Sequence, residues 1–248
     1  AGLASEGMKP FVYSIANFPT FRCAEQIRND VAYHNLPVTI VSVGSGLSYG
    51  ALGYSHHAVQ DLSLMRSFPN MTICTPCDPN EVSSSLDHIL SVNNPCYLRL
   101  GKAGEENITT EGYECSESAL RLVKSFKFND SATPLNIIVP GSLITQINKY
   151  IESFIPPHSI NLYSCPVWST KYVDTLISSL TNLNKILIIE EHLLGGGFGS
   201  WLLESMHNQP NFDTKTIRTM ALNDKVCGEV ASQEELIQYG GINLDSFK

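Results

Sequence analysis

The sequence predicts an α/β protein of two domains, each built on a mostly parallel sheet flanked by helices. Short β-rich apolar runs alternate with helical patterns along the chain, which is typical of parallel α/β architecture. The alternation stops at a polar, glycine-containing stretch and then restarts. Because the chain has 248 residues, 43% of them hydrophobic, each half is long enough to bury a core.

The first half alternates strand and helix patterns. Asp78, Pro79 and Glu81 form the clearest helix start, with an N-cap, a proline at the first helical position and a glutamate three residues after the cap. For the helix expected at 57–67, we expect the Ser55 hydroxyl to cap the N-terminus. In chain order we expect strand 10–14, helix 22–34, strand 38–43, helix 57–67, strand 71–75, helix 79–92 and strand 96–100.

The stretch at residues 101–118, GKAGEENITTEGYECSES, has no sustained period of 2 or 3.6 and is interpreted as a linker. The two domains are therefore placed at residues 1–112 and 119–248. In the second domain we expect a strand within 119–124, strand 135–139, helix 143–154, strand 160–164, helix 172–180, strand 185–189, helix 198–207, strand 216–221 and helix 233–239.

Charge and cysteine usage narrow the class of protein. The net charge of −8 comes from scattered residues, so no basic stripe is available for nucleic acid. No apolar run reaches the roughly 20 residues that span a bilayer, so we expect a soluble protein that is not inserted in a membrane. Seven cysteines without a secretory signal favour reduced thiols and a cytoplasmic location rather than a disulfide framework.

Two short motifs allow alternative interpretations. Cys74 and Cys77 form a C-x-x-C, but a second pair of zinc ligands is missing, and a redox site usually opens its helix directly after the second cysteine. We favour a strand end and expect no metal site. The segment 190–204, EEHLLGGGFGSWLLE, suggests phosphate binding by a glycine-rich turn. Ser200 stands where the third glycine of that fingerprint belongs, so close helix packing is favoured instead.

One combination of segments resembles a known family. LPVTIVSVGSG is followed by GYSHHAVQDLSLMRSFPNMTICTPCDPNEV and then by PCYLRLGKAG, all within residues 36–104. These blocks closely resemble the pyrimidine-binding domain of transketolases, 1-deoxyxylulose-5-phosphate synthases and 2-oxo-acid dehydrogenase β subunits. The second half is similar, more loosely, to the transketolase C-terminal domain. The resemblance thus marks residues 1–112 as a pyrimidine-binding domain whose N-terminal part is missing, and residues 119–248 as the C-terminal domain.

The resemblance implies thiamine diphosphate as cofactor and Mg²⁺ as its metal. In this family a domain absent from this chain holds the diphosphate through the metal, while the pyrimidine-binding domain of another subunit holds the aminopyrimidine. The cofactor supplies the carbanion chemistry. We therefore expect an N-terminal-type transketolase subunit as partner, in a homo- or hetero-oligomer such as a dimer or an α2β2 assembly.

The family's functional residues map onto this chain one at a time. The aromatic ring that stacks on the aminopyrimidine corresponds to Phe18, with Phe21 as a second choice and core packing of both as the alternative. The active-site histidine, which contacts substrate and helps proton transfer, corresponds to His56, and His57 replaces the glutamine beside it. Arg99 matches the arginine that binds the anionic end of phosphosugars, with a salt-bridged strand-end arginine as the alternative.

Three departures from the family pattern bear on function. Gly44 stands where transketolases have a histidine and deoxyxylulose-phosphate synthases an arginine, and Leu52 replaces an aspartate that recognises a substrate hydroxyl. Donor or acceptor specificity should differ accordingly. The family's catalytic glutamate would precede Ala1, so we expect the natural polypeptide to extend upstream.

Three functions follow from the resemblance. The first is transfer of a two-carbon ketol unit between sugar or sugar-phosphate substrates, by the C-terminal subunit of a split transketolase-like enzyme that is active only with its partner. The second is the β subunit of a 2-oxo-acid dehydrogenase. The third is a non-catalytic scaffold of the same fold. The first is favoured because the sequence around His56 is closer to the transketolase branch.

Overall fold

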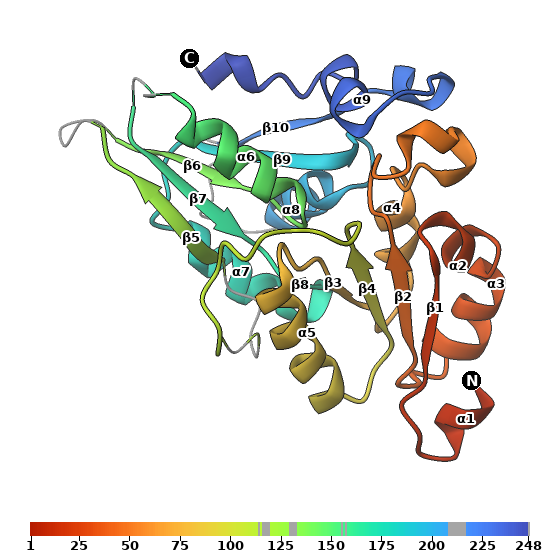
Figure 1. Ribbon diagram of the computed structural model, residues 1–248. Helices are drawn as coiled ribbons and strands as arrows, with labels where there is room; N and C mark the ends of the chain where they lie inside the picture. The colour runs from red at the N-terminus through yellow and green to blue at the C-terminus, as the bar shows by residue number, and fades with distance from the viewer. Residues whose placement is uncertain are drawn as a thin grey trace.

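Two five-stranded sheets form the framework of the computed structural model (Figure 1). The structure describes residues 1–113, 115, 120–128, 133–154, 156, 158–207 and 217–247. In sheet order, the first sheet consists of β1 (Phe11–Ile15), β2 (Thr39–Val43), β4 (Cys96–Leu100), β3 (Thr72–Cys74) and β8 (Val167–Trp168). The second consists of β10 (Ile217–Leu222), β9 (Ile186–Leu193), β6 (Leu135–Ile138), β7 (Ile160–Ser164) and β5 (Arg121–Phe126).

Each sheet is parallel except for one antiparallel edge strand. In the first sheet β1, β2, β4 and β3 are parallel, and β8 pairs antiparallel to β3. In the second, β10, β9, β6 and β7 are parallel, and β5 pairs antiparallel to β7. The predicted α/β class with two mostly parallel sheets is therefore confirmed.

Helices connect the parallel strands, as right-handed crossover connections require. The longest is α5, whose start at Pro79 matches the sequence prediction because the Asp78 side chain accepts a hydrogen bond from the Glu81 N–H at 2.9 Å. The α-helices are α1 (Gly2–Ser5), α2 (Asn17–Phe21), α3 (Ala24–Gln26), α4 (Asp61–Met65), α5 (Pro79–Ser91), α6 (Leu143–Glu152), α7 (Val173–Leu180), α8 (Phe198–His207) and α9 (Gln233–Tyr239). No helix in this described part of the chain is long and apolar enough to cross a membrane.

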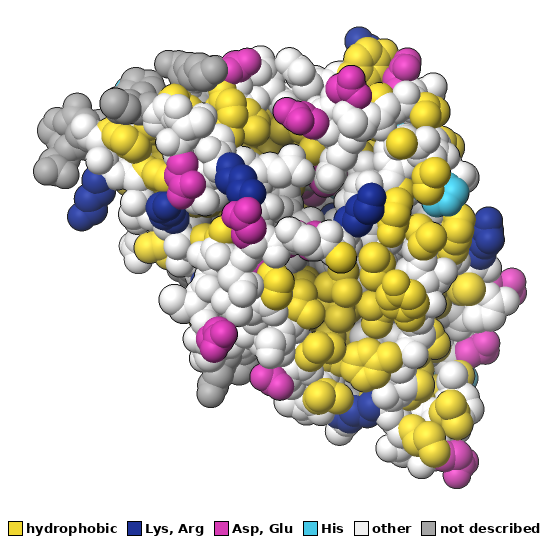
Figure 2. All heavy atoms as spheres, in the orientation of Figure 1, with side chains coloured by type: hydrophobic (Ala, Val, Ile, Leu, Met, Phe, Trp, Pro, Cys, Tyr) yellow, Lys and Arg dark blue, Asp and Glu magenta, His cyan; other side chains and the backbone are white. Residues whose placement is uncertain are grey.

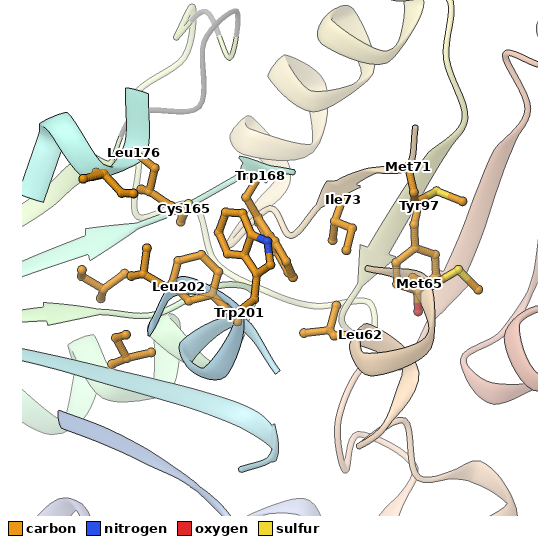
Figure 3. Close-up of a cluster of buried hydrophobic side chains, with 14 of the residues drawn as sticks. Leu62, Met65, Met71, Ile73, Tyr97, Cys165, Trp168, Leu176, Trp201 and Leu202 are labelled. Carbon is orange, nitrogen blue, oxygen red and sulfur yellow. The ribbon is translucent and has the colours of Figure 1, made fainter. Parts of the chain in front are cut away.

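The two halves share a hydrophobic core rather than meeting at a polar linker. Strand β8 belongs to the second half of the chain but pairs with the first sheet, where Trp168 lies opposite Ile73. Figure 3 shows Trp168 and Trp201 beside Ile73 and Tyr97 in one buried cluster. The predicted boundaries at residues 112 and 119 stay a prediction, and Glu114 and residues 116–119 lie outside the described part of the chain.

Two predicted helices differ from the structure. The helix expected at 22–34 begins at Ala24 and is divided into α3 and a π-helix at Ile27–Ala32, and the backbone of Cys23, at φ −112° and ψ 12°, separates it from α2. The helix expected at 57–67 begins only at Asp61. His57 is extended at φ −72° and ψ 115°, so it lies outside the helix.

The residues before α4 form two short 3₁₀ turns, Gly50–Leu52 and Tyr54–His56. The predicted cap at Ser55 is therefore wrong. The Ser55 hydroxyl lies 3.0 Å from His56 Nδ1 instead, and the N-cap position of α4 is Gln60. A tight chain of turns is favoured here because Gly53 adopts φ +80°, which a residue with a Cβ rarely does.

The outer edge of the first sheet is apolar and exposed. In the edge strand β1 the side chains of Phe11, Val12 and Tyr13 are 42%, 46% and 71% exposed. Figure 2 shows apolar side chains gathered over this part of the first sheet. A contiguous apolar patch of this kind marks an interaction surface more often than a surface that stays in water.

Candidate active site

Phe18 and His56 lie in contact beyond the carboxyl ends of neighbouring parallel strands. Helix α2, which carries Phe18, follows β1 directly, and the 3₁₀ turn with His56 lies between β2 and α4. The two ring centroids are 5.1 Å apart, with an angle of 64° between the ring planes. The carboxyl ends of parallel strands are where open α/β sheets bind ligands. The structure therefore brings together two of the residues selected from the sequence.

The His56 ring is held on one side and partly exposed. Its Nδ1 lies 3.0 Å from the Ser55 hydroxyl, an interaction that can fix the imidazole tautomer. The Tyr49 ring is 6.5 Å from the His56 ring, also edge-on. An imidazole fixed through Nδ1 presents Nε2 to a bound molecule, which is the arrangement that proton transfer requires.

Phe21 is placed differently from Phe18. It ends α2 and is 46% exposed, whereas Phe18 is half-buried and contacts both His56 and Arg22. The Arg22 guanidinium carbon lies 4.2 Å from the centroid of the Phe18 ring. The cofactor contact predicted for either phenylalanine stays a prediction, and the geometry favours Phe18.

The two adjacent histidines point into different environments. His57 is 1% exposed, and its Nε2 lies 3.2 Å from the Gly50 carbonyl oxygen. Its own carbonyl accepts a hydrogen bond from the Asn17 side chain. A ring buried in this way does not face substrate, so the placement of His57 does not favour the predicted catalytic role. Its contacts join α2 to the turns that carry His56.

Arg99 lies inside the protein. It is 4% exposed, and its Nε donates to Asp61 Oδ2 at 2.8 Å while Nη2 donates to the carbonyl oxygens of Ala58 and Glu191 at 2.8 and 3.2 Å. Burial works to raise the pKa of Asp61, but the charges of Arg99 and His192 and the hydrogen bonds from Arg99 and Tyr97 together outweigh it and hold that pKa below the usual value. These contacts match the salt-bridged alternative, and the phosphate-binding role of Arg99 remains an untested prediction.

The Tyr49 ring accounts for Gly44, one of the positions that depart from the family pattern. Gly44 has φ +85°, and a Cβ built there would lie 2.0 Å from Cε2 of Tyr49. The Tyr49 ring thus fills the space that a side chain at position 44 would occupy. Leu52 is 56% exposed. Sequence reasoning missed Tyr49, although a glycine at a position that usually carries a large side chain was a signal that another residue fills the space.

The glycine-rich segment in the second half closes on a carboxylate of the protein. Glu190 accepts hydrogen bonds from the backbone N–H groups of Phe198 and Gly199 at 2.6 and 3.1 Å, at the start of α8. A Cβ on Gly197 would lie 2.2 Å from Glu190 Oε2, so glycine is required for this approach. The helix N–H groups that a phosphate would need are therefore occupied. This favours the packing interpretation over phosphate binding.

Cys74 and Cys77 agree with the strand-end interpretation. Cys74 is the last residue of β3, and both thiols are buried and unbridged. Burial raises the pKa of both thiols above the usual value, which disfavours the reactive thiolate. Over the residues that the structure describes, no group of three or more His, Cys, Asp or Glu side chains could hold a metal ion.

Comparisons with known proteins find relatives along the whole chain. A family model described as the transketolase pyrimidine-binding domain matches residues 1–104. An apulose-4-phosphate transketolase subunit of Phocaeicola vulgatus is 29% identical over 97% of this chain and 74% of its own length. A putative transketolase C-terminal section of Methanocaldococcus jannaschii is 28% identical over 99% of this chain and 75% of its own length. A 1-deoxy-D-xylulose-5-phosphate synthase of Prochlorococcus marinus is 31% identical over 94% of this chain but only 36% of its own length.

Solved structures share the fold. A split-gene transketolase, described as an inactive beta4 tetramer, has a TM-score of 0.77 at 24% identity and covers 99% of this chain and 75% of its own. A transketolase from Campylobacter jejuni has a TM-score of 0.63 at 15% identity over 96% of this chain and 34% of its own. The resemblance to the transketolase family is therefore confirmed, with a transketolase pyrimidine-binding domain at residues 1–104 and similarity to transketolase C-terminal sections along the whole chain.

Proposed function

We propose that this chain is the C-terminal-type subunit of a split transketolase-like enzyme, which transfers a two-carbon ketol unit between sugar-like substrates with thiamine diphosphate. The observation that carries the proposal is the contact between Phe18 and His56, within the part of the chain that matches the pyrimidine-binding domain. One relative is named as a transketolase subunit and another as a C-terminal section, and both names support a division of the enzyme between two chains.

The residues around Phe18 fit the aminopyrimidine part of the cofactor. The planar guanidinium of Arg22 lies over the Phe18 ring, so the space above the ring accommodates a flat, polar group. Arg22 is exposed and can move aside. Asn17 Oδ1 is buried without a hydrogen-bond partner among the described residues. Buried polar atoms of this kind usually acquire a partner, such as water or a ligand.

The chain's own residues would bind, orient and exchange protons. When bound, thiamine diphosphate supplies the electron sink that allows a carbon–carbon bond beside a carbonyl group to break and form again. Phe18 would pack on the aminopyrimidine, and Ser55 would hold the His56 tautomer. His56 would bind a substrate oxygen and move a proton through Nε2, a role that imidazole side chains commonly have in enzymes.

A partner subunit would complete the site. We propose that an N-terminal-type transketolase subunit holds the diphosphate and Mg²⁺, in a dimer or α2β2 assembly in the cytoplasm. The exposed apolar side chains of β1 support an assembly, because such a patch is stabilised by burial against another chain. The substrates would be sugars or sugar phosphates. Tyr49 and Leu52 would give the enzyme a substrate specificity that differs from that of common transketolases.

Reconstitution with the partner subunit tests the proposal. With the full-length polypeptide, including any residues upstream of Ala1, and the partner subunit, we expect ketol transfer from a ketose phosphate to an aldehyde acceptor that depends on thiamine diphosphate and on both chains, with each chain alone as control. Decarboxylation of 2-oxo acids in place of ketol transfer would identify a dehydrogenase β subunit. A folded assembly without turnover on either class of substrate would identify a scaffold, and full activity of this chain alone would contradict a split enzyme.

A further inference from the structure

Glu191 connects the second half of the chain to the segment that carries His56. We define the His56 segment as residues 44–57, which run from the end of β2 through both 3₁₀ turns. Glu191 lies in β9 and is 3% exposed. Its Oε1 accepts a hydrogen bond from the Leu47 backbone N–H at 2.7 Å. This N–H is buried, so Glu191 satisfies a donor that water does not reach.

Gln233, the first residue of α9, holds the same carboxylate from the other side. Its Nε2 donates to Oε1 and Oε2 of Glu191 at 2.9 and 3.1 Å. The carboxylate therefore lies between α9 and the His56 segment. It is oriented by one group from each half of the chain.

Close backbone packing accompanies these hydrogen bonds. A Cβ on Gly46 would lie 2.3 Å from the carboxyl carbon of Glu191. A Cβ on Gly50 would lie 2.6 Å from Leu236 Cδ1 and 2.7 Å from the Ala231 carbonyl oxygen. The glycines thus allow the start of α9 and the Glu191 carboxylate to contact the backbone of the His56 segment directly. The two halves of the chain are therefore closely packed at this segment.

We propose that Glu191 and Gln233 are positioning residues, through which the second half of the chain holds the His56 segment in the geometry that presents His56 beside Phe18. The inference rests on the proposed function for its catalytic meaning, although the mechanical contact can be tested without it. The segment forms turn hydrogen bonds of its own, such as that from the Gly53 N–H to the Gly50 carbonyl, while its buried Leu47 N–H is paired by a side chain of the second half. The second half thus adds an external restraint to the turns that carry His56.

Glu190 provides a matched control on the same strand. It is adjacent to Glu191, is 1% exposed and also binds backbone N–H groups, but those groups belong to α8. A substitution at Glu190 removes an equally buried carboxylate without touching the His56 segment. Any effect that is specific to the segment must therefore separate the two glutamates.

Amide hydrogen exchange measured by mass spectrometry tests the contact on the chain itself. Removing the acceptor of a buried N–H should make opening of the segment roughly 10- to 100-fold more frequent. We expect Glu191→Ala to raise exchange of residues 47–56 by this factor, Glu191→Gln to restore most of the protection, and Glu190→Ala to affect the start of α8 instead. Unchanged exchange of the segment in Glu191→Ala, or an equal increase in Glu190→Ala, would overturn the inference.

Gln233→Ala keeps the test decisive if Glu191→Ala does not fold. Gln233 is partly exposed, and its loss leaves the bond between Glu191 and Leu47 in place. We expect a smaller increase in exchange over residues 47–56, about threefold, because only one of the two anchors is lost. Protection equal to that of the unmodified chain would count against the inference.

Kinetics of the reconstituted enzyme give the catalytic readout. A misplaced His56 should lower kcat by roughly tenfold or more and leave KM for the donor within about threefold, with Glu191→Gln recovering most of kcat. No ketol transfer by the unmodified assembly would defeat the proposed function, while the exchange data would still decide the contact. An active assembly whose kcat and exchange are insensitive to Glu191→Ala would defeat the inference alone.

Discussion

The pair Phe18–His56 and the pair Asp61–Arg99 are made of residues that often carry chemistry, but they occupy opposite environments. Phe18 and His56 are half-buried beyond the ends of β1 and β2. Asp61 and Arg99 are 0% and 4% exposed. The first pair is open to a ligand, whereas the second is enclosed between the two halves of the chain. Burial, more than residue type, separates the candidate catalytic group from the group that stabilises the fold.

The buried pair Asp61–Arg99 also forms hydrogen bonds that an isolated ion pair would lack. Tyr97 donates to Asp61 Oδ2 at 2.6 Å, and Arg99 donates to Asp61 and to carbonyl oxygens from both halves of the chain. A buried ion pair is tolerated when further hydrogen bonds satisfy its remaining atoms. We infer that Arg99 holds the halves together at this contact.

Removal of the His56 imidazole should have the largest effect on turnover. A group that transfers protons contributes typically 10²- to 10⁴-fold to the rate, so we expect His56→Ala to lower kcat of the reconstituted enzyme by a factor in that range. Because His56 is partly exposed, the free energy of unfolding should change little. Steady-state kinetics and urea denaturation measure the two effects. Unchanged turnover would remove His56 from the site.

Substitution in the buried pair Asp61–Arg99 should lower the stability of the fold. Asp61→Ala leaves the charge of Arg99 buried without its partner, and we expect the free energy of unfolding to fall by about 3–5 kcal/mol. Glu106→Ala is the control, since it breaks an ion pair with Lys149 in which the two side chains are 65% and 57% exposed, and it should cost below about 1 kcal/mol. Urea denaturation measures both. Similar losses in the two variants would contradict the distinction between buried and exposed pairs.

The two phenylalanines of α2 should differ in their contribution to cofactor binding. Phe18→Ala removes the ring that contacts His56, and we expect thiamine diphosphate affinity of the assembled enzyme to fall about tenfold, as loss of one stacking contact predicts. Phe21→Ala should change it about twofold or less, because that ring is more exposed and ends the helix. Calorimetric titration with the cofactor distinguishes them. A larger loss in Phe21→Ala would reverse the assignment.

Much of the fold could be predicted from the sequence because parallel α/β structure has strong local signals. Apolar runs located the central strands, and the Asp78 cap located α5. The errors fall where local signals are weak. Helix α4 starts four residues later than expected because the two 3₁₀ turns and extended His57 precede it, and the apolar period alone does not show where the turns end.

The candidate site was predictable only in part, for a similar reason. Family spacing selected Phe18 and His56, which the structure brings together. It did not show that Arg99 is enclosed by Asp61, or that Glu191 contacts Leu47, because both contacts join segments far apart in the chain. Long-range polar contacts depend on how the two sheets pack, and no local pattern encodes that packing.

The smallest expected effect concerns how stability depends on pH. Burial raises the pKa of both Glu190 and Glu191 from 4.5 to about 7. The folded state therefore retains protons that the unfolded state has released, so their contribution to stability is present below pH 4.5 and is lost as the pH rises through 7. His192 acts in the opposite sense, since burial lowers its pKa from 6.5 to about 4, and its contribution is present above pH 6.5 and is lost progressively as the pH falls from 6.5 through 4.

Above pH 6.5 the change should therefore come from the two glutamates rather than from His192. We expect the free energy of unfolding to decrease by on the order of 1 kcal/mol between about pH 6.5 and 8. Glu190→Gln combined with Glu191→Gln should remove most of this decrease, because neither amide titrates while both keep an oxygen acceptor. Urea denaturation across that range measures it. An equal decrease in the double variant would show that other groups cause the pH dependence and that the two carboxylates are already ionised in the folded chain.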